Sequence, residues 1–216
     1  MSKVATRTRI LDGALDVFAR KGYHRAIVDD IVRASGTSKG AVYHHFSNKE
    51  ALFVALVDDF ADLLASSVAT AIGARHGALA KVDGALTAVL TTFADNQRLA
   101  RLILLEAMSL GPTYQRKRAE VSERFATLIQ RYLDEAVADG SLPLVDTRVA
   151  TLAWLGAVNE VVVQWLHGAV RDLGATTPAL TRLLLRSVGS AVGSEDAPVS
   201  LARRTPSGSR RRGSRG

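Results

Sequence analysis

Hydrophobic residues recur along this chain at intervals of three and four positions, the spacing that places side chains on one face of an α-helix. The first such stretch has the apolar face Ile10, Leu11, Ala14, Leu15 and Phe18. Strand-like alternation of polar and apolar residues never extends beyond a few positions, and the chain has neither an internal repeat nor a βαβ rhythm. The pattern therefore predicts an all-α protein with about nine helices.

Glycine, proline and capping residues divide this pattern into segments. Ser47 and Glu50 form a Ser-x-x-Glu capping box before the fourth segment. Asp146 or the residue after it caps the eighth, and Thr177 followed by Pro178 opens the ninth. The predicted helices cover about residues 6–21, 28–34, 38–46, 48–71, 79–94, 97–109, 113–139, 146–170 and 177–192.

The stretch from Gly22 to Leu52 contains two short helical runs around a sharp break. The first run ends at Ala34, and Gly36 stands where the end of a helix favours a left-handed residue. Ser38 can cap the second run. Helix, tight turn and helix is the arrangement that lays a second helix in the major groove of DNA.

Six short matches in this region carry a resemblance to a known family: Gly22-Tyr23, Asp30-Ile31, Ala34-Ser35-Gly36, Ser38-Lys39-Gly40, Tyr43-His44-His45-Phe46 and Lys49-Glu50-Ala51-Leu52. Over about residues 5–65 the chain resembles the N-terminal domain of TetR-family transcriptional regulators. It departs from that pattern at Val32 and Thr37, and also at Ile27, where Ser or Thr usually caps the second helix and touches a phosphate.

The resemblance implies a three-helix DNA-binding head at residues 1–47 and a helical effector-binding and dimerisation body at residues 48–194. It implies a homodimer that binds double-stranded DNA at a palindromic operator. The expected function is that of a repressor, which a small hydrophobic or amphipathic ligand releases from its operator.

The second helix of the motif supplies most of the expected DNA contacts. Gly40 and its small neighbour would let the backbone approach base edges, and Lys39 can donate to guanine. A hydroxyl from Tyr43 and the helix N-terminus at Lys49 suit phosphate. The alternative is an ordinary solvated turn and helix. The residues expected to contact DNA are Ser38, Lys39, Gly40, Ala41, Tyr43, His44, His45 and Lys49.

No catalytic or metal-binding constellation competes with this interpretation. Residues 36–40 also match the Gly-x-Ser-x-Gly pattern of a nucleophile elbow, but that motif needs a preceding strand and here a helical run precedes it. His44 and His45 are adjacent, so they point to different sides of a helix and do not form a metal site. We expect no enzyme activity and no cofactor.

The net charge of +7 is unevenly distributed. Residues 197–216 hold six arginines and no acidic residue, and residues 1–49 hold nine basic residues against four acidic ones. A basic head suits phosphate contact. Residues 195–216 are expected to be a disordered tail, and a sequence-tolerant nucleic-acid binder driven by that tail is the competing functional class.

The chain has no cysteine, which excludes disulfides and thiolate metal sites. Its N-terminus is polar, with no signal-peptide core, and no run of about 18 apolar residues predicts a membrane span. We expect a cytoplasmic protein that does not bind membranes.

The eighth predicted helix is apolar almost all round from Trp154 to Leu166, which is typical of a helix buried on several sides. The resemblance implies that it packs against the ninth helix and a second subunit; a monomeric core is the alternative. The residues expected at the dimer interface are Trp154, Val158, Val162, Leu180, Leu183, Leu184 and Val188.

A small-molecule site needs apolar walls with a few polar groups, and several predicted body helices could share such an interior. Structural hydrogen bonding is the alternative for Asn159, and pairing with Arg101 is the alternative for Glu106. The residues expected to line the effector site are Phe93, Leu102, Glu106, Phe125, Tyr132, Asn159 and Trp165.

Overall fold

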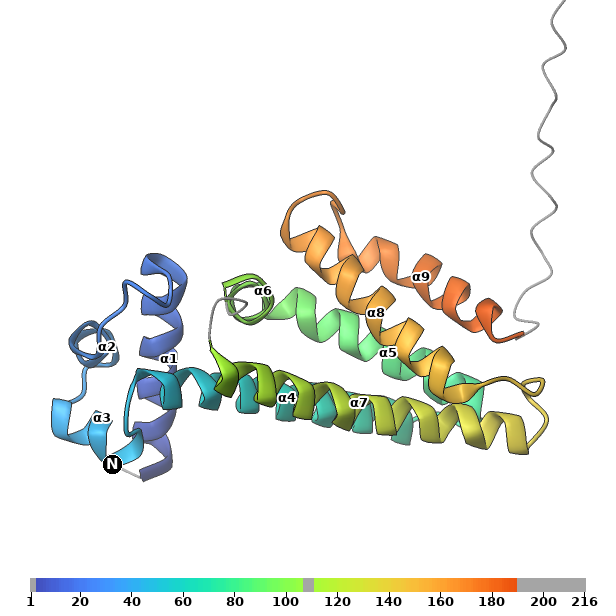
Figure 1. Ribbon diagram of the computed structural model, residues 1–216, viewed down its shortest axis with the longest axis horizontal. Coiled ribbons are helices and arrows are strands. Elements are labelled where there is room, and N and C mark those ends of the chain that lie inside the picture. The colour runs from blue at the N-terminus through green and yellow to red at the C-terminus, as the bar shows by residue number, and fades with distance from the viewer. Residues whose placement is uncertain (1–2, 107–110, 190–216) are drawn as a thin grey trace, which may run out of the picture.

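The computed structural model describes residues 3–106 and 111–189, and the predicted basic tail lies outside these residues. All regular structure in the described residues is helical, which confirms the all-α prediction (Figure 1). The elements are α1 (Lys3–Lys21), α2 (Val28–Ser35), α3 (Lys39–His45), α4 (Lys49–Gly73), α5 (Ala78–Asp95), α6 (Gln97–Arg101), the π-helical turn η1 (Leu102–Glu106), α7 (Pro112–Ala138), α8 (Thr147–Leu166) and α9 (Leu173–Ser187).

Helices α1, α2 and α3 form a small head at one end of the molecule (Figure 1). Its core is apolar and closed, with Ile10, Phe18 and Ile31 fully buried. Gly13 of α1 lies so close to the end of α2 that an added Cβ would stand 2.8 Å from the backbone nitrogen of Ser35. The absence of a side chain at this crossing lets the two helices pack closely.

Helix α4 leaves the head and runs into the body, where it lies beside the long α7 (Figure 1). Its N-cap is Asn48, whose side chain accepts a hydrogen bond from the Ala51 N–H at 2.7 Å. The predicted capping box of Ser47 and Glu50 is therefore wrong. An Asx cap one residue further along already satisfies a donor at the start of the helix, so the helix begins one residue later.

Acidic residues on α4 connect it to both parts of the molecule. Asp59 accepts two hydrogen bonds from the guanidinium of Arg7 in α1, each 2.9 Å long. Asp62 pairs with Arg124 of α7 at 2.8 Å. These exposed pairs add little stability individually. They show that α4 contacts α1 of the head with one part of its length and α7 of the body with the next.

A second apolar cluster fills the body among α5, α7, α8 and α9, with Leu133, Trp154 and Leu173 among its most buried members. The indole N–H of Trp154 donates to the Ser187 hydroxyl at 3.2 Å. α8 and α9 are thereby tied together on the side of the body away from α4.

The predicted helix over residues 97–109 is shorter and less regular than expected. An α-helix covers Gln97–Arg101, and a π-helical turn, Leu102–Glu106, follows it; the remaining positions lie outside the described residues. The buried Tyr114 hydroxyl donates to the Ile103 carbonyl at 2.6 Å. α7 thus supplies a partner to the backbone of this turn from a distant part of the sequence.

The predicted start of the last helix at Thr177 is also wrong, because α9 begins at Leu173. Asp172 caps it by accepting from the Ala175 N–H at 3.1 Å, and Pro178 lies inside the helix. Leu173 is 2% exposed, so its burial favours the earlier start. α8 ends at Leu166, four residues before the predicted end.

Most residues predicted at the dimer interface are buried within the protomer, and this prediction is wrong for them. They belong to the body core because both helices turn those faces inward, and a helix that is apolar all round does not reveal which face that is. Val158 is half-buried, and Leu183 is 65% exposed. The residues buried inside the protomer are Trp154, Val162, Leu180, Leu184 and Val188.

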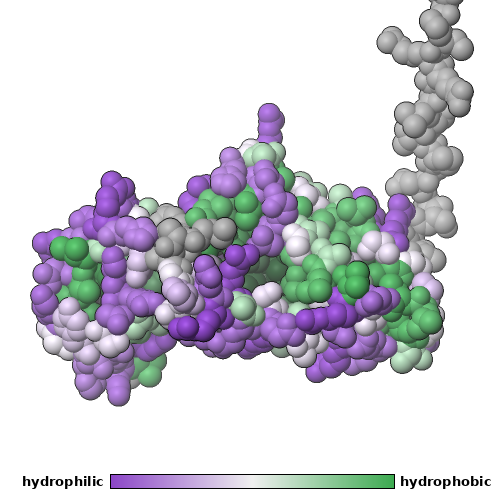
Figure 2. All heavy atoms as spheres, in the orientation of Figure 1, coloured by the Kyte–Doolittle hydropathy of each residue, from purple (hydrophilic) through white to green (hydrophobic). Residues whose placement is uncertain are grey.

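By length and composition alone, α8 would suffice to cross a membrane, with a mean hydropathy of 1.4, although a membrane span was not expected from the sequence. Only 22% of the apolar stretch is buried inside the protomer. Figure 2 shows apolar surface on the α8 and α9 side of the body, whereas the head surface is mostly hydrophilic. The body therefore exposes an apolar face that the head does not.

Candidate functional sites

The turn between α2 and α3 has the geometry that its sequence predicts. Gly36 is left-handed, with φ 60° and ψ 32°, and the Thr37 N–H donates to the Val32 carbonyl at 3.3 Å. Ser38 caps α3 by accepting from the Ala41 N–H at 3.1 Å. Ile27 caps α2 without a side-chain hydrogen bond, as its apolar side chain requires.

The outer face of α3 is exposed at most of the positions expected to meet DNA. Ser38, Lys39, Gly40 and His44 are exposed, and Tyr43 is 49% exposed. A Cβ added at Gly40 would meet only the Ser38 Oγ, at 4.0 Å. This glycine is thus not required by packing within the protein, and its absent side chain leaves room for an outside partner.

Lys39 carries a partner that the sequence did not reveal. Its Nζ lies 2.8 Å from a carboxylate oxygen of Asp29, in the first turn of α2, and this hydrogen bond raises the pKa of Lys39. Asp29 therefore competes with any DNA group for the ammonium, and it keeps the side chain of Lys39 beside the start of α3.

His45 is half-buried at the end of α3, where its ring lies 5.3 Å from that of His44. Burial lowers the pKa of His45, and the positive charges of His44, Lys3 and Arg7 lower it further. The neutral form of His45 is therefore favoured in the free protein, whereas the negative charge of an approaching phosphate would favour the protonated form.

The Lys49 side chain is placed differently from what the sequence led us to expect. Its ammonium donates to the carbonyls of Tyr23, His24 and Ala26 at 2.8, 3.3 and 3.0 Å. An ammonium has three donors, so all of them are used on backbone oxygens. A side-chain contact with phosphate does not fit this arrangement, while a contact through the Lys49 backbone N–H stays a prediction.

The body contains a cavity of about 300 Å³ between α4, α5, η1, α7 and α8. Its walls are mostly apolar, and α4 contributes Val57, Phe60 and Leu64. The polar groups around it are Arg118 and Ser122 of α7 and Asn159 of α8. An apolar interior with a few polar groups is the arrangement that small-molecule sites require.

Four of the predicted effector-site residues line this cavity or its continuation. Phe93, Phe125 and Asn159 line the main cavity, and Tyr132 lines the adjoining space. The buried Leu102 packs in the core shared by head and α4, and Trp165 packs in the body core; neither lines these spaces. The side chain of Glu106 lies outside the described residues.

Apart from Phe125, the face of α7 that lines the cavity was not predicted from the sequence. Tyr114, Arg118, Val121, Ser122 and Phe125 all line the cavity. They recur at intervals of three and four, so the helical spacing of a mixed polar and apolar face could have identified them together.

The cavity continues in two directions. Outward, it shares Tyr114, Arg118 and Ser122 with an open groove along α7. Inward, it shares Phe125 and Val158 with a narrower, almost wholly apolar space. The three spaces therefore adjoin one another, from the exposed residue Arg118 at one end to apolar side chains at the other.

Comparison with protein families identifies both parts of the chain. The family described as "Bacterial regulatory proteins, tetR family" matches residues 10–56, and "Tetracyclin repressor-like, C-terminal domain" matches residues 76–168. The chain belongs to the TetR family. The resemblance seen in the sequence of the helix-turn-helix motif is thus confirmed and extends into the body.

Relatives of this TetR-family protein align over most of its length. The fatty acid metabolism regulator protein of Bacillus subtilis is 24% identical over 182 residues, covering 83% of this chain and 94% of the relative. The structure of the fatty acid degradation regulator FadR of Bacillus halodurans has a TM-score of 0.75 and 26% identity, covering 82% and 97%. FadR of Bacillus subtilis in complex with stearoyl-CoA has the same TM-score at 23% identity, covering 82% and 96%.

These relatives are transcriptional regulators, and so is this protein: it binds DNA, controls transcription and is not an enzyme. The residues that contact the operator and the effector are not identified by the comparisons.

Proposed function

We propose that this TetR-family protein is a homodimeric cytoplasmic repressor that binds a palindromic operator through α3 and is released by an amphipathic ligand with a long acyl chain and an anionic head. The observation that carries the ligand class is the series of adjoining spaces from Arg118 to the apolar end of the cavity. The exposed face of α3 supports the operator contact.

The exposed side of α8 and α9 supports the homodimer. Apart from Glu160, the exposed positions spaced four residues apart on this face are glycine, alanine or leucine, and small residues let two helices approach closely. Two copies related by a two-fold axis would bury the apolar surface of α8 in a bundle of four helices. The exposed positions are Leu152, Gly156 and Glu160 on α8 and Ala175, Ala179 and Leu183 on α9.

Leu183→Glu tests this interface, because it places a charge on the exposed face without disturbing the protomer core. We expect a monomer in sedimentation analysis and loss of binding to a two-half-site operator. Leu63→Glu on α4, where Leu63 is 44% exposed, is the control and should remain dimeric. A dimer that survives Leu183→Glu would place the interface elsewhere.

The chemistry of the cavity supports an acyl ligand. Apolar walls from α4, α5 and α7 suit a hydrocarbon chain, whereas the guanidinium of Arg118 suits a carboxylate or phosphate at the mouth. The relatives named above regulate fatty acid metabolism, and one of them is seen with stearoyl-CoA. Ligand-driven displacement of α4 would alter the separation of the two α3 helices that an operator requires.

Calorimetry with acyl-CoA thioesters of graded chain length, free fatty acids and free coenzyme A tests this proposal. Thermodynamic reciprocity requires operator DNA to weaken ligand binding by the factor by which ligand weakens DNA binding. Equal ligand affinity with and without operator would show that the cavity is not the switch.

Two variants locate the binding site. Val121→Phe fills the cavity and should abolish binding of the longest chains, while Leu144→Phe, at a position 94% exposed, should bind like the wild type. Wild-type affinity in Val121→Phe would place the ligand outside this cavity.

A further inference from the structure

The segment that joins α1 to α2 has little regular structure of its own. It covers residues 22–27, turns at the left-handed Gly22 (φ 76°), and contains one local hydrogen bond, from the Ala26 N–H to the Gly22 carbonyl at 3.2 Å. Backbone carbonyls in such a segment need partners. Here the partner comes from Lys49, 23 to 26 residues further along the chain.

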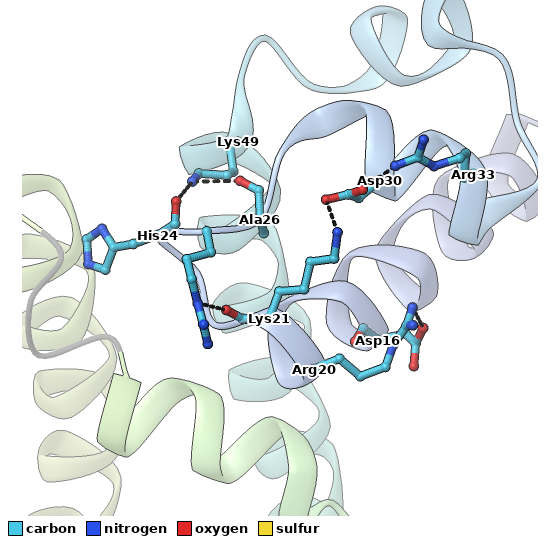
Figure 3. A network of polar contacts seen from close by, with 9 residues as sticks. Asp16, Arg20, Lys21, His24, Ala26, Asp30, Arg33 and Lys49 are labelled. Carbon is cyan, nitrogen blue, oxygen red and sulfur yellow. Dashed lines mark hydrogen bonds and ion pairs between the residues drawn. The ribbon is translucent and has the colours of Figure 1, made fainter.

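Figure 3 shows the Lys49 ammonium at the carbonyls of His24 and Ala26; the Tyr23 carbonyl is its third acceptor. The same nitrogen lies 4.4 Å from the centroid of the Tyr23 ring, within the range of a cation–π contact. Among the described residues no carboxylate forms an ion pair with Lys49, and burial lowers the pKa of Lys49. The Lys49 ammonium is thus stabilised by the dipoles of three backbone carbonyls and by the face of the Tyr23 ring.

A second polar group fixes the segment at its ends. Asp30 of α2 is 7% exposed, and its carboxylate pairs with Lys21 at the end of α1 at 2.8 Å and with Arg33 (Figure 3). The Lys21 pair joins α1 to α2, the Arg33 pair lies within α2, and neither reaches α4. Lys49 connects the segment to the start of α4 through the hydrogen bonds of its side chain.

This connection lies on the route between the two functional sites. The Tyr23 ring stacks edge-on against Phe53 of α4, with centroids 5.3 Å apart, and Phe53 contacts Tyr114 at 5.6 Å. Tyr114 lines the body cavity. The segment held by Lys49 therefore touches the first turns of α4 and, through one ring, a wall of the effector site.

We propose that Lys49 is a positioning residue for operator binding. Its ammonium holds the α1–α2 segment on the start of α4, so that α2 and α3 keep a fixed orientation relative to the body, and it does not contact phosphate. The proposal rests on the operator binding proposed above. This role accounts for the three hydrogen bonds that the Lys49 ammonium donates to backbone carbonyls inside the protein.

The test compares Lys49→Met and Lys49→Arg in the full-length protein, using an operator selected from random DNA by the wild type. We expect Lys49→Met to lower operator affinity about tenfold or more, the effect of losing hydrogen bonds to a charged group. The dependence of affinity on salt should keep its wild-type slope. Amide exchange in residues 22–27 should accelerate, while exchange in α7 and α8 stays unchanged.

Lys49→Arg separates the two roles even if Lys49→Met does not fold. A planar guanidinium retains the charge for a phosphate but does not converge on three carbonyls from one point. Positioning therefore predicts a loss of affinity and faster exchange in Lys49→Arg, whereas a phosphate contact predicts near wild-type binding. Lys81→Met in the body is the control for loss of a lysine and should change neither quantity.

Two results would overturn the proposal. One is a salt slope that falls by about 0.9 for each head in Lys49→Met, the signature of a lost phosphate contact. The other is wild-type exchange in residues 22–27 in both variants. Amide exchange is measured on the free protein, so it tests the positioning role without DNA. A wild-type protein that shows no operator preference would count against the proposed function alone.

Discussion

The head and the body of this regulator are both built from helices, but they differ in how completely side chains fill their interiors. Where the head meets the start of α4, Phe18, Tyr23 and Phe53 form an aromatic cluster with ring centroids 5.3 to 6.1 Å apart. In the body, Phe60 and Phe93 also stack, at 5.3 Å, but both line a cavity of about 300 Å³. The head is filled by its own side chains, whereas the body has room for another molecule.

The two parts differ at their surfaces as well. The surface of the head is mostly hydrophilic, although Val4 and Ile27 are exposed, and several of its cations are paired, as Lys21 and Arg33 are with Asp30. The body exposes an apolar face on α8 and α9. A filled head thus contrasts with a body that has a cavity and an exposed apolar face, and substitutions should distinguish the two.

Phe53→Ala should have the largest effect. The ring is 1% exposed and touches Phe18, Tyr23 and Tyr114. Removing a buried ring of this kind lowers the free energy of unfolding by about 3–5 kcal/mol. Denaturant unfolding at a fixed protein concentration measures it, and a loss below about 1 kcal/mol would mean that the cluster is not close-packed.

The matched change in the body, Phe125→Ala, should cost less, about 1–2 kcal/mol, because the half-buried ring already faces the cavity and leaves fewer contacts to lose. It should also admit bulkier ligands, which calorimetry would detect. Equal losses of stability in the two phenylalanine variants would remove the distinction between a filled head and a hollow body.

Gly13→Ala should destabilise the head by about 1–3 kcal/mol, as overpacking does. The new methyl group would stand 2.8 Å from the Ser35 backbone nitrogen, so α1 and α2 must separate. The better helix propensity of alanine offsets only about 1 kcal/mol of that cost. Gly73→Ala, where no atom lies within 4 Å of the new Cβ, is the control, and a stability loss there as large as in Gly13→Ala would contradict the steric account.

Gly40→Ala should act in the opposite direction on stability, adding up to about 1 kcal/mol through helix propensity. The nearest atom to the new Cβ is 4.0 Å away in the free protein. Operator affinity should nevertheless fall, because the methyl group would stand on the face that meets DNA. Unfolding and operator titrations on one preparation measure both effects, and unchanged affinity would show that α3 does not approach DNA at this residue.

His45→Gln should give the smallest effect, visible only as a change in pH dependence. Because the folded protein lowers the pKa of His45, the unfolded chain binds the proton more readily. The wild-type head should therefore lose stability as pH falls from about 6.5 through the lowered folded pKa, and His45→Gln should lose less. At higher pH the two proteins should unfold alike. Parallel pH profiles would mean that His45 is not the responsible group.

Short-range features of this protein were determined by the sequence itself. The left-handed Gly36, the cap at Ser38 and the cap at Asp146 each depend on atoms a few residues apart, and the structure has all three. The helix-turn-helix motif could be predicted because its dihedral angles and hydrogen bonds are local. The exposed reading face of α3 follows from the same periodicity.

Only the tertiary structure decided the features that join distant segments. The donors of Lys49 meet carbonyls 23 to 26 residues away, and Arg118 faces a cavity whose other walls come from four other elements. Two start signals competed for α9, and the burial of Leu173 favoured the earlier one. The apolar α8 has no polar side that would mark its outer face. Its packing against α7 and α9 determines which face lies outside. Each outcome depends on burial among residues far apart in the chain, which local periodicity does not encode.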